Sequence, residues 1–100
     1  MKTKSELINK TVIARIERAG VFMGVLDHID GDIVRLKDVR RIYYWEGALS
    51  VTDMAVNGIT NGRVTVAVGV AEFNRSALVE INECTEEAVK KIKAIVPWRA

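Results

Sequence analysis

The feature that most constrains the fold of this chain is a series of short apolar segments separated by two-residue turn signals. Glycine follows a small or polar residue at Ala19-Gly20, Asp30-Gly31 and Asn61-Gly62. Glycine at these places tolerates the positive φ that tight hairpin turns require. The pattern therefore predicts a meander of antiparallel strands joined by short turns.

Strands are predicted where apolar side chains recur at every second position. In residues 11–18, Val12, Ala14 and Ile16 share one face, and Arg15 and Glu17 share the other. The second predicted strand has Gly24 in its middle, which usually marks a bulge, a bend or a close backbone approach. The remaining predicted segments are strands at 21–29, 33–37 (closed by Asp38), 40–45, 63–68 and 78–82, with a loop or strand start at 73–76.

Two short helices are predicted, one in the middle of the chain and one near its end. Ser50 and Asp53 have the spacing of a capping box before a helix at about 51–56, which Asn57-Gly58 ends. Thr85 caps the second helix, and the acidic residues that follow it suit the positive end of the helix dipole. The apolar stripe of that helix is Ala88, Ile92 and Ile95, and Pro97 stops it.

These elements predict a single domain, residues 1–100, that is mainly β (α+β). We expect a small curved antiparallel sheet, or a partly open barrel of the SH3-like or Sm-like type, with two short helices. The segment 24–30 followed by 33–36 resembles the bent second strand and the third strand of that barrel. A fold of this kind does not determine a function.

Composition excludes several classes of protein. The net charge of +2 is too small for the broad basic face of a duplex nucleic-acid binder. With Cys84 as the only cysteine, neither an internal disulfide nor a cysteine-based zinc site can form within one chain. Residues 1–6 lead into no apolar run that suits a signal peptide, and no stretch approaches the ~20 residues of a membrane span. We therefore expect a protein of the cytosol with no membrane partner.

The most distinctive segment is Arg40 to Trp45, which combines two arginines with three aromatic residues. Arginine binds phosphate through a planar fork, and aromatic rings stack on bases. Strand alternation would place Arg40, Ile42 and Tyr44 on one face, and Arg41, Tyr43 and Trp45 on the other. Two interpretations stay open. The rings complete the core or a subunit interface, or they form a platform for a flat, phosphorylated ligand.

One row of rings is too little for a micromolar ligand, because a stacked base contributes ~1–3 kcal/mol and a micromolar Kd needs roughly −8 kcal/mol. A second wall must therefore come from elsewhere in the chain or from another subunit. Its candidates lie around Ala19-Gly20, although a plain hairpin turn is the favoured interpretation of this pair. Its backbone N–H groups would suit a phosphate. The candidate ligand-binding residues are therefore Arg40, Arg41, Tyr43, Tyr44, Trp45, Arg15, Arg18 and Phe22.

Three other residues have simpler interpretations. His28 lies among aspartates at 27–32, but the segment lacks the spacing of a calcium loop, and a polar hairpin tip is expected. Cys84 is expected to be a small buried residue before the helix cap. Trp98 either docks onto the core or reaches into a neighbouring subunit. No catalytic group, metal site or cofactor is predicted.

Four segments of the chain resemble a family of small uncharacterised proteins encoded by phages and prophages. The similar segments are 15–26, 38–50, 84–88 and 96–100, and the arginine-aromatic block is the most specific of them. The family pattern often has tryptophan where this chain has Tyr43. The resemblance implies a phage setting and a non-enzymatic accessory role.

Several small phage proteins sequester cyclic nucleotide or cyclic ADP-ribose signals, and we expect the same of this chain. In this hypothesis a phage-encoded homo-oligomer in the host cytosol holds a nucleotide-derived immune signal in pockets at its subunit junctions. A protein-protein interaction module that inhibits a host factor or acts in phage assembly is the first alternative. An Sm-like RNA binder is the second, and the low net charge counts against it.

Overall fold

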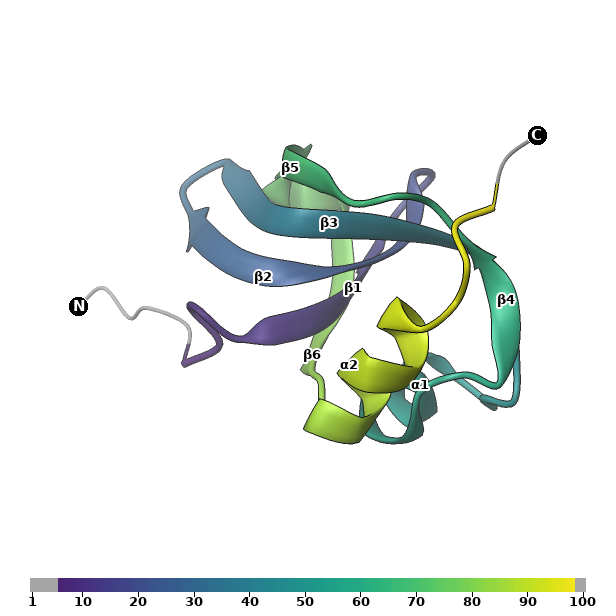
Figure 1. Cartoon of the computed structure of the whole chain (residues 1–100). Helices are drawn as coiled ribbons and strands as arrows, with labels where there is room; N and C mark the ends of the chain where they lie inside the picture. The colour runs from purple at the N-terminus through teal and green to yellow at the C-terminus, as the bar shows by residue number, and fades with distance from the viewer. Residues whose placement is uncertain (1–5, 99–100) are drawn as a thin grey trace.

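The computed structural model describes residues 6–98. Residues 1–5, which belong to the segment considered for a signal peptide, and residues 99–100, which end the last similar segment, lie outside the described residues. The described elements in chain order (Figure 1) are β1 (Thr11–Ile16), β2 (Gly20–Asp30), β3 (Ile33–Glu46), α1 (Val51–Asn57), β4 (Asn61–Val64), β5 (Val68–Asn74), a 3-10 turn (Arg75–Ala77), β6 (Leu78–Glu83) and α2 (Glu86–Lys93).

The strands form one antiparallel sheet in the order β4-β3-β2-β1-β6. β3 is long enough to pair with β4 near its C-terminal end and with β5 along its N-terminal half. The sheet is curved, and α1 and α2 lie side by side against one end of it (Figure 1). The predicted fold class is confirmed: the domain is a mainly β, open antiparallel sheet with two short helices.

The sheet is buried on both faces, and each face has its own core. Along β1, Val12 and Ala14 point into a core shared with β2, β3, β5 and β6, and Ile13 between them points into a core beneath the helices. All three side chains are fully buried. Arg15, the next residue on the helix side, is exposed, so the helix-side core ends there.

The two strands predicted at 33–37 and 40–45 are a single strand, β3. Asp38 does not close a strand but adopts a φ of 51° within β3 and opposite Gly24, where the register of β2 and β3 shifts by one residue. Of the three features that Gly24 was predicted to mark, the structure shows a bulge, whose extra residue lies in β3 opposite Gly24, and a close backbone approach. A Cβ atom at Gly24 would lie 2.9 Å from the carbonyl oxygen of Lys37, so the two backbones approach too closely there for any other residue.

The strand predicted at 63–68 was wrong in the opposite way, because it is divided between β4 and β5. At the break, the backbone N–H of Arg41 donates to the Thr65 hydroxyl at 2.9 Å instead of to a backbone carbonyl. Asn61-Gly62 belongs to β4 and is not a turn. A Cβ at Gly62 would lie 2.5 Å from the carbonyl oxygen of Tyr44, so this glycine serves a close strand contact.

Both predicted helices are confirmed together with their caps. The Ser50 hydroxyl accepts from the N–H of Asp53 at 3.1 Å, and the Thr85 hydroxyl accepts from the N–H of Ala88 at 3.1 Å. α2 ends at Lys93, so Ile95 lies beyond it and still packs on the helix-side core. Within residues 6–98, no helix has the length and apolar character needed to span a membrane.

Candidate functional site

The arginine-aromatic block contains a bulge that overturns its predicted alternation. Ile42 pairs with Val64 and Tyr44 pairs with Arg63, so Tyr43 is an extra residue in β3. A one-residue insertion reverses the faces of every residue that follows. Trp45 therefore packs against the helix-side core with Ile42, and Tyr43 and Tyr44 are both about half exposed, at 52% and 48%. The predicted outward row of Arg41, Tyr43 and Trp45 does not exist.

The two arginines of the block point to opposite faces of the sheet. Arg40 lies opposite Met23 of the helix-side core and forms an ion pair with Asp38 at 3.5 Å. Asp38 also forms an ion pair with Lys93 of α2 at 3.5 Å. Arg41 lies opposite Phe22 on the other face. Of these two candidate ligand-binding arginines, only Arg41 faces the hairpin loop between β1 and β2, so the structure does not bring them together.

Arg41 begins a series of alternating cations and rings, which we call the cation-ring ladder. Its guanidinium carbon lies 5.4 Å from the centroid of the Phe22 ring and 4.9 Å from that of Tyr43. Trp98 meets Tyr43 edge-on, with ring centroids 6.0 Å apart. Arg63 continues the series over Trp98 at 5.1 Å and over Tyr44 at 6.0 Å. Such contacts are each worth roughly 0.5–1 kcal/mol at exposed sites.

Trp98 is positioned by the ladder contacts together with a backbone hydrogen bond to β4. The backbone N–H of Trp98 donates to the carbonyl oxygen of Val64 at 2.9 Å, so this residue docks along β4 of its own chain. At the far end of the ladder, the Tyr44 hydroxyl donates to a carboxylate oxygen of Glu46 at 2.7 Å. This hydrogen bond to a negative charge raises the pKa of Tyr44 above its ordinary value.

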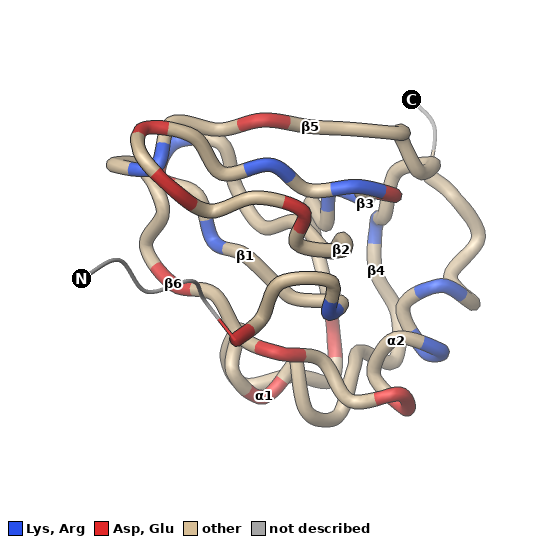
Figure 2. Tube along the Cα trace, turned by 90° about the vertical axis from the view of Figure 1, so that its left-hand side faces the viewer, with Lys and Arg blue, Asp and Glu red and all other residues tan. Residues whose placement is uncertain are grey.

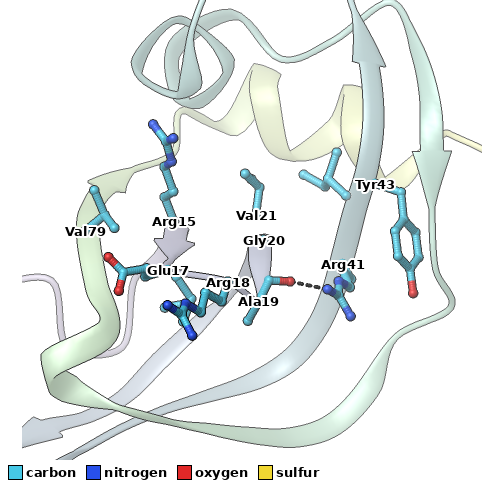
Figure 3. Close-up of a pocket in the computed structure, with 11 residues that line it drawn as sticks. Arg15, Glu17, Arg18, Ala19, Gly20, Val21, Arg41, Tyr43 and Val79 are labelled. Carbon is cyan, nitrogen blue, oxygen red and sulfur yellow. Dashed lines mark hydrogen bonds between the residues drawn. The ribbon is translucent and has the colours of Figure 1, made fainter.

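Beside the ladder lies an open hollow of about 680 Å³, which we call the basin (Figure 3). The loop between β1 and β2 forms its middle, β3 contributes one side, and Val79 of β6 stands on the other. Antiparallel pairing brings these segments together, because β1 pairs with both β2 and β6, and β2 pairs with β3. The residues that carry its chemistry are Arg15, Glu17, Arg18, Ala19, Arg41 and Tyr43.

The basin gathers positive charge that the chain itself leaves uncompensated. Within residues 6–98, the guanidinium groups of Arg15, Arg18 and Arg41 have no carboxylate at ion-pairing distance. Glu17 also lines the basin, but its side chain points towards the Val79 side and away from Arg41 (Figure 3). A carboxylate cannot satisfy three cations, so an added anion would find a positive site.

Arg41 is held in place, whereas Arg18 occupies an unfavourable backbone conformation. A guanidinium N–H of Arg41 donates to the carbonyl oxygen of Ala19, which ties β3 to the hairpin loop. Arg18 has a φ of 65°, a left-handed conformation that costs most side chains about 1–2 kcal/mol. Other described residues at positive φ are glycines or the more tolerant Asn9 and Asp38. Strain of this kind concentrates at functional sites.

The remaining predicted site residues lie outside the basin. Phe22 is 8% exposed and packs in the core against Phe73, with ring centroids 4.7 Å apart, so the structure places this candidate ligand residue in the core and not in the basin. Tyr44 lies at the far end of the ladder. Trp45 lines an adjoining hollow of about 450 Å³, the second hollow, whose other polar residues are Arg15, Ser50 and Glu80.

Sequence reasoning missed Glu17 and Val79 in the basin and Glu80 in the second hollow. Glu17 was detectable, because it lies between two candidate arginines. The two β6 residues were not, because only the pairing of β6 with β1 brings them beside the hairpin loop.

His28 and Cys84 behave as simple structural residues. A ring nitrogen of His28 lies 3.2 Å from the carbonyl oxygen of Asp30, close to the hairpin tip between β2 and β3. Among residues 6–98, no group of three or more histidine, cysteine or acidic side chains is arranged to hold a metal ion. Burial, together with the nearby charge of Glu83, raises the pKa of the Cys84 thiol to about 12, so the reactive thiolate is scarce at neutral pH.

Comparison with known proteins identifies a family for this chain. The model of a family described as a domain of unknown function (DUF6948) matches residues 9–92. No curated protein and no solved structure matches the chain. The matched residues include every strand of the sheet and nearly all of α2.

Proposed function

This chain belongs to the DUF6948 family, and we propose that it is a non-catalytic binding protein for a small phosphorylated molecule that carries a flat ring, such as a nucleotide-derived signal. The observation that supports this most is the set of three guanidinium groups around one open hollow, none with a carboxylate partner in the described chain. A guanidinium binds phosphate through paired hydrogen bonds, so this hollow suits a phosphorylated guest.

Each residue has a distinct part in this proposal. The loop arginine, Arg18, and the anchored Arg41 contact the phosphate from two sides. Arg41 loses little freedom on binding because the Ala19 carbonyl and two rings already hold it. The exposed part of the Tyr43 ring, at the rim, packs against the ring of the ligand. No step of bond making or breaking is required.

A protein of this kind acts by mass action, and the resemblance to phage proteins favours sequestration as its purpose. In this proposal the ligand is an immune signal of the cyclic oligonucleotide or cyclic ADP-ribose type. A second copy of the chain would supply the missing wall of the open basin, since Tyr43 and Val79 at its rim are 52% and 54% exposed. Analytical ultracentrifugation with and without ligand tests this assembly.

Calorimetric titration with GMP, cyclic di-GMP and cyclic ADP-ribose tests the proposed ligand class. We expect at least one of them to bind, and Arg18→Gly to weaken it about tenfold, or 1.4 kcal/mol. Arg75→Ala is the matched control, because Arg75 is an exposed arginine on the 3-10 turn outside the basin. Absence of binding at millimolar concentration, or equal weakening by Arg75→Ala, would contradict the proposal.

A protein-contact role is the second candidate, and exposed valines favour it. Val66, Val68 and Val70 are 46%, 50% and 54% exposed near or on β5, and Tyr44 is similarly exposed at the end of the ladder. Aromatic and apolar side chains are common in protein interfaces. Tyr44→Ala and Val70→Lys lie outside the basin, so they separate the two functions: they would abolish a protein complex and leave nucleotide binding unchanged.

RNA binding has less support from the charge distribution. In Figure 2 the basic positions are interspersed with acidic ones, and the series on β3 has acidic neighbours on β2 and β5. A ring that binds RNA would need a continuous positive surface and would show strong dependence on salt. Fluorescence anisotropy with labelled RNA at two salt concentrations tests this alternative.

A further inference from the structure

The second hollow shares a wall with the basin. Both are lined by Arg15 and Val21, so the two hollows adjoin at this pair of side chains. In Figure 3 the side chain of Arg15 points away from Arg18 and Arg41, to the opposite side of the basin. The second hollow is also lined by Trp45 and by Ser50 and Val51 at the start of α1. Arg15 therefore stands between two adjoining spaces.

The two spaces differ in chemistry. The basin has three arginines and one carboxylate, whereas the second hollow has one arginine, a tryptophan and the carboxylate of Glu80. Glu80 lies directly opposite Arg15 in the register of β1 and β6, yet the two side chains form no ion pair. Both groups are half-buried or exposed and remain available to a ligand.

Only one of the two carboxylate oxygens of Glu80 accepts hydrogen bonds from described residues. Oε2 accepts from the Asn82 amide at 2.9 Å and lies 3.5 Å from the Thr52 hydroxyl. Oε1 has no hydrogen-bond partner among the described residues. An ionised carboxylate only accepts hydrogen bonds, so Oε1 suits a group that carries N–H donors. Beside it, the Trp45 ring offers a flat apolar surface for a base.

We propose that the ligand is a dinucleotide: its linking phosphate contacts Arg15, one ring lies at the Tyr43 side of the basin, and a second, amino-bearing ring enters the second hollow against Trp45 and Glu80. This inference rests on the proposed function and narrows it from any nucleotide to one with two rings. A mononucleotide fills only one of the two spaces, and a ring without N–H donors leaves the Glu80 carboxylate unmatched.

The experiment compares the linear dinucleotide pGpG with GMP by calorimetric titration. We expect pGpG to bind the natural chain at least tenfold more tightly than GMP. Glu80→Gln should remove most of that difference and leave the affinity for GMP unchanged, because Asn82 and Thr52 hold the amide oxygen and turn the NH₂ group towards the ligand. Glu83→Gln is the matched control on β6, since Glu83 pairs with Lys10 at 3.6 Å outside the second hollow.

The outcomes separate this inference from the proposed function. Equal affinities for pGpG and GMP that both decrease in Arg18→Gly overturn the dinucleotide assignment and leave the basin intact as a binding site. A loss of GMP affinity in Glu80→Gln also overturns it, since GMP would then occupy the second hollow. Failure of both nucleotides to bind counts against the basin itself, and the dinucleotide assignment falls with it.

Discussion

Arg35 and Arg41 lie in the N-terminal and C-terminal halves of the same strand, β3, but only Arg35 is paired with carboxylates. Arg35 donates to Glu72 at 2.6 Å and pairs with Asp27 at 3.4 Å, and Lys37 adds a second contact to Asp27 at 3.1 Å. Arg41 has no carboxylate in the described chain and contacts a carbonyl oxygen and two rings instead. The cations in the N-terminal half of β3 are therefore neutralised by carboxylates of the same chain, whereas Arg41 in the C-terminal half is not.

This difference follows from the strands that flank each half. β5 and β2 bring Glu72 and Asp27 to ion-pairing distance of Arg35 in the first half. Beside the second half, β4 brings Arg63, and the β1–β2 loop brings Arg18 and Glu17, whose side chain points away from Arg41. Exposed ion pairs contribute about 0–1 kcal/mol to stability, so the pairs in the N-terminal half of β3 add little to the free energy of unfolding. Arg41 is held by a hydrogen bond and two ring contacts instead, so its positive charge stays unneutralised by any carboxylate of the described chain.

The largest effect is expected where β4 meets the C-terminal half of β3. Gly62→Ala would place a Cβ atom 2.5 Å from the Tyr44 carbonyl oxygen and lower the free energy of unfolding by about 3 kcal/mol. Gly69→Ala is the control along the N-terminal half, where a Cβ meets nothing within 4 Å. Urea denaturation measures both. Equal stability of the two variants would show that the close contact at Gly62 can relax.

A smaller difference is expected between the two arginines themselves. Arg41→Gln loses the bond to Ala19 and two cation-ring contacts, so unfolding should become easier by about 1–2 kcal/mol. Arg35→Gln loses exposed ion pairs and should cost less than about 1 kcal/mol. High salt should reduce the loss of unfolding free energy in Arg35→Gln, because salt screens exposed ion pairs, and should leave the loss in Arg41→Gln nearly unchanged. If Arg35→Gln proved the more destabilising, the contrast between the two halves would be wrong.

Arg18→Gly should act in the opposite direction on stability and on binding. Glycine adopts the left-handed conformation at this position without strain, so the free energy of unfolding should rise by up to about 1 kcal/mol. The same change removes a basin cation and should weaken anion binding. Thermal unfolding and titration of one protein sample test both effects. A variant that is less stable than the natural chain would show that the Arg18 side chain supports the fold.

The smallest effect concerns pH. The hydrogen bond from Lys37, with that from Arg35, lowers the pKa of Asp27 below its ordinary value. A carboxyl group with a lowered pKa in the folded state stabilises the fold above its unfolded pKa of about 3.9, and this contribution is lost as pH falls. The stability difference between the natural chain and Asp27→Asn should therefore shrink below about pH 4. A difference that persists at pH 2 would point to packing instead.

The sequence was sufficient for the sheet, the two capped helices and part of the site, and the reasons are local. Alternation of apolar residues at 11–18 and the caps at Ser50 and Thr85 act over a few residues, so they can be recognised in a linear sequence. Arg15 and Arg18 can be grouped with Arg41 as candidate ligand-binding residues from the sequence, because the hairpin turn is expected to lie beside the arginine-aromatic strand. The structure places these three arginines around one basin.

What could not be predicted depends on single-residue shifts and on distant pairing. The bulge at Tyr43 leaves no mark in composition, yet it reverses the faces of Tyr44 and Trp45. The separation of Arg40 from Arg41 follows from plain alternation, but their opposite surroundings depend on where α2 and the hairpin loop pack. Glu80 joins the second hollow only because β6 returns across the fold to β1.

The hydrogen bond from Trp98 to Val64 has a consequence for how copies of this protein can associate. The outer side of an edge strand presents unpaired backbone N–H and C=O groups, with which a strand of another chain can pair. At β4 the C-terminal segment already occupies that side, and the indole stacked on Arg63 adds bulk over it. Lateral growth of the sheet through β4 is therefore opposed at Val64 by the chain's own C-terminal segment, and β5 and β6 are other edge strands through which copies could pair.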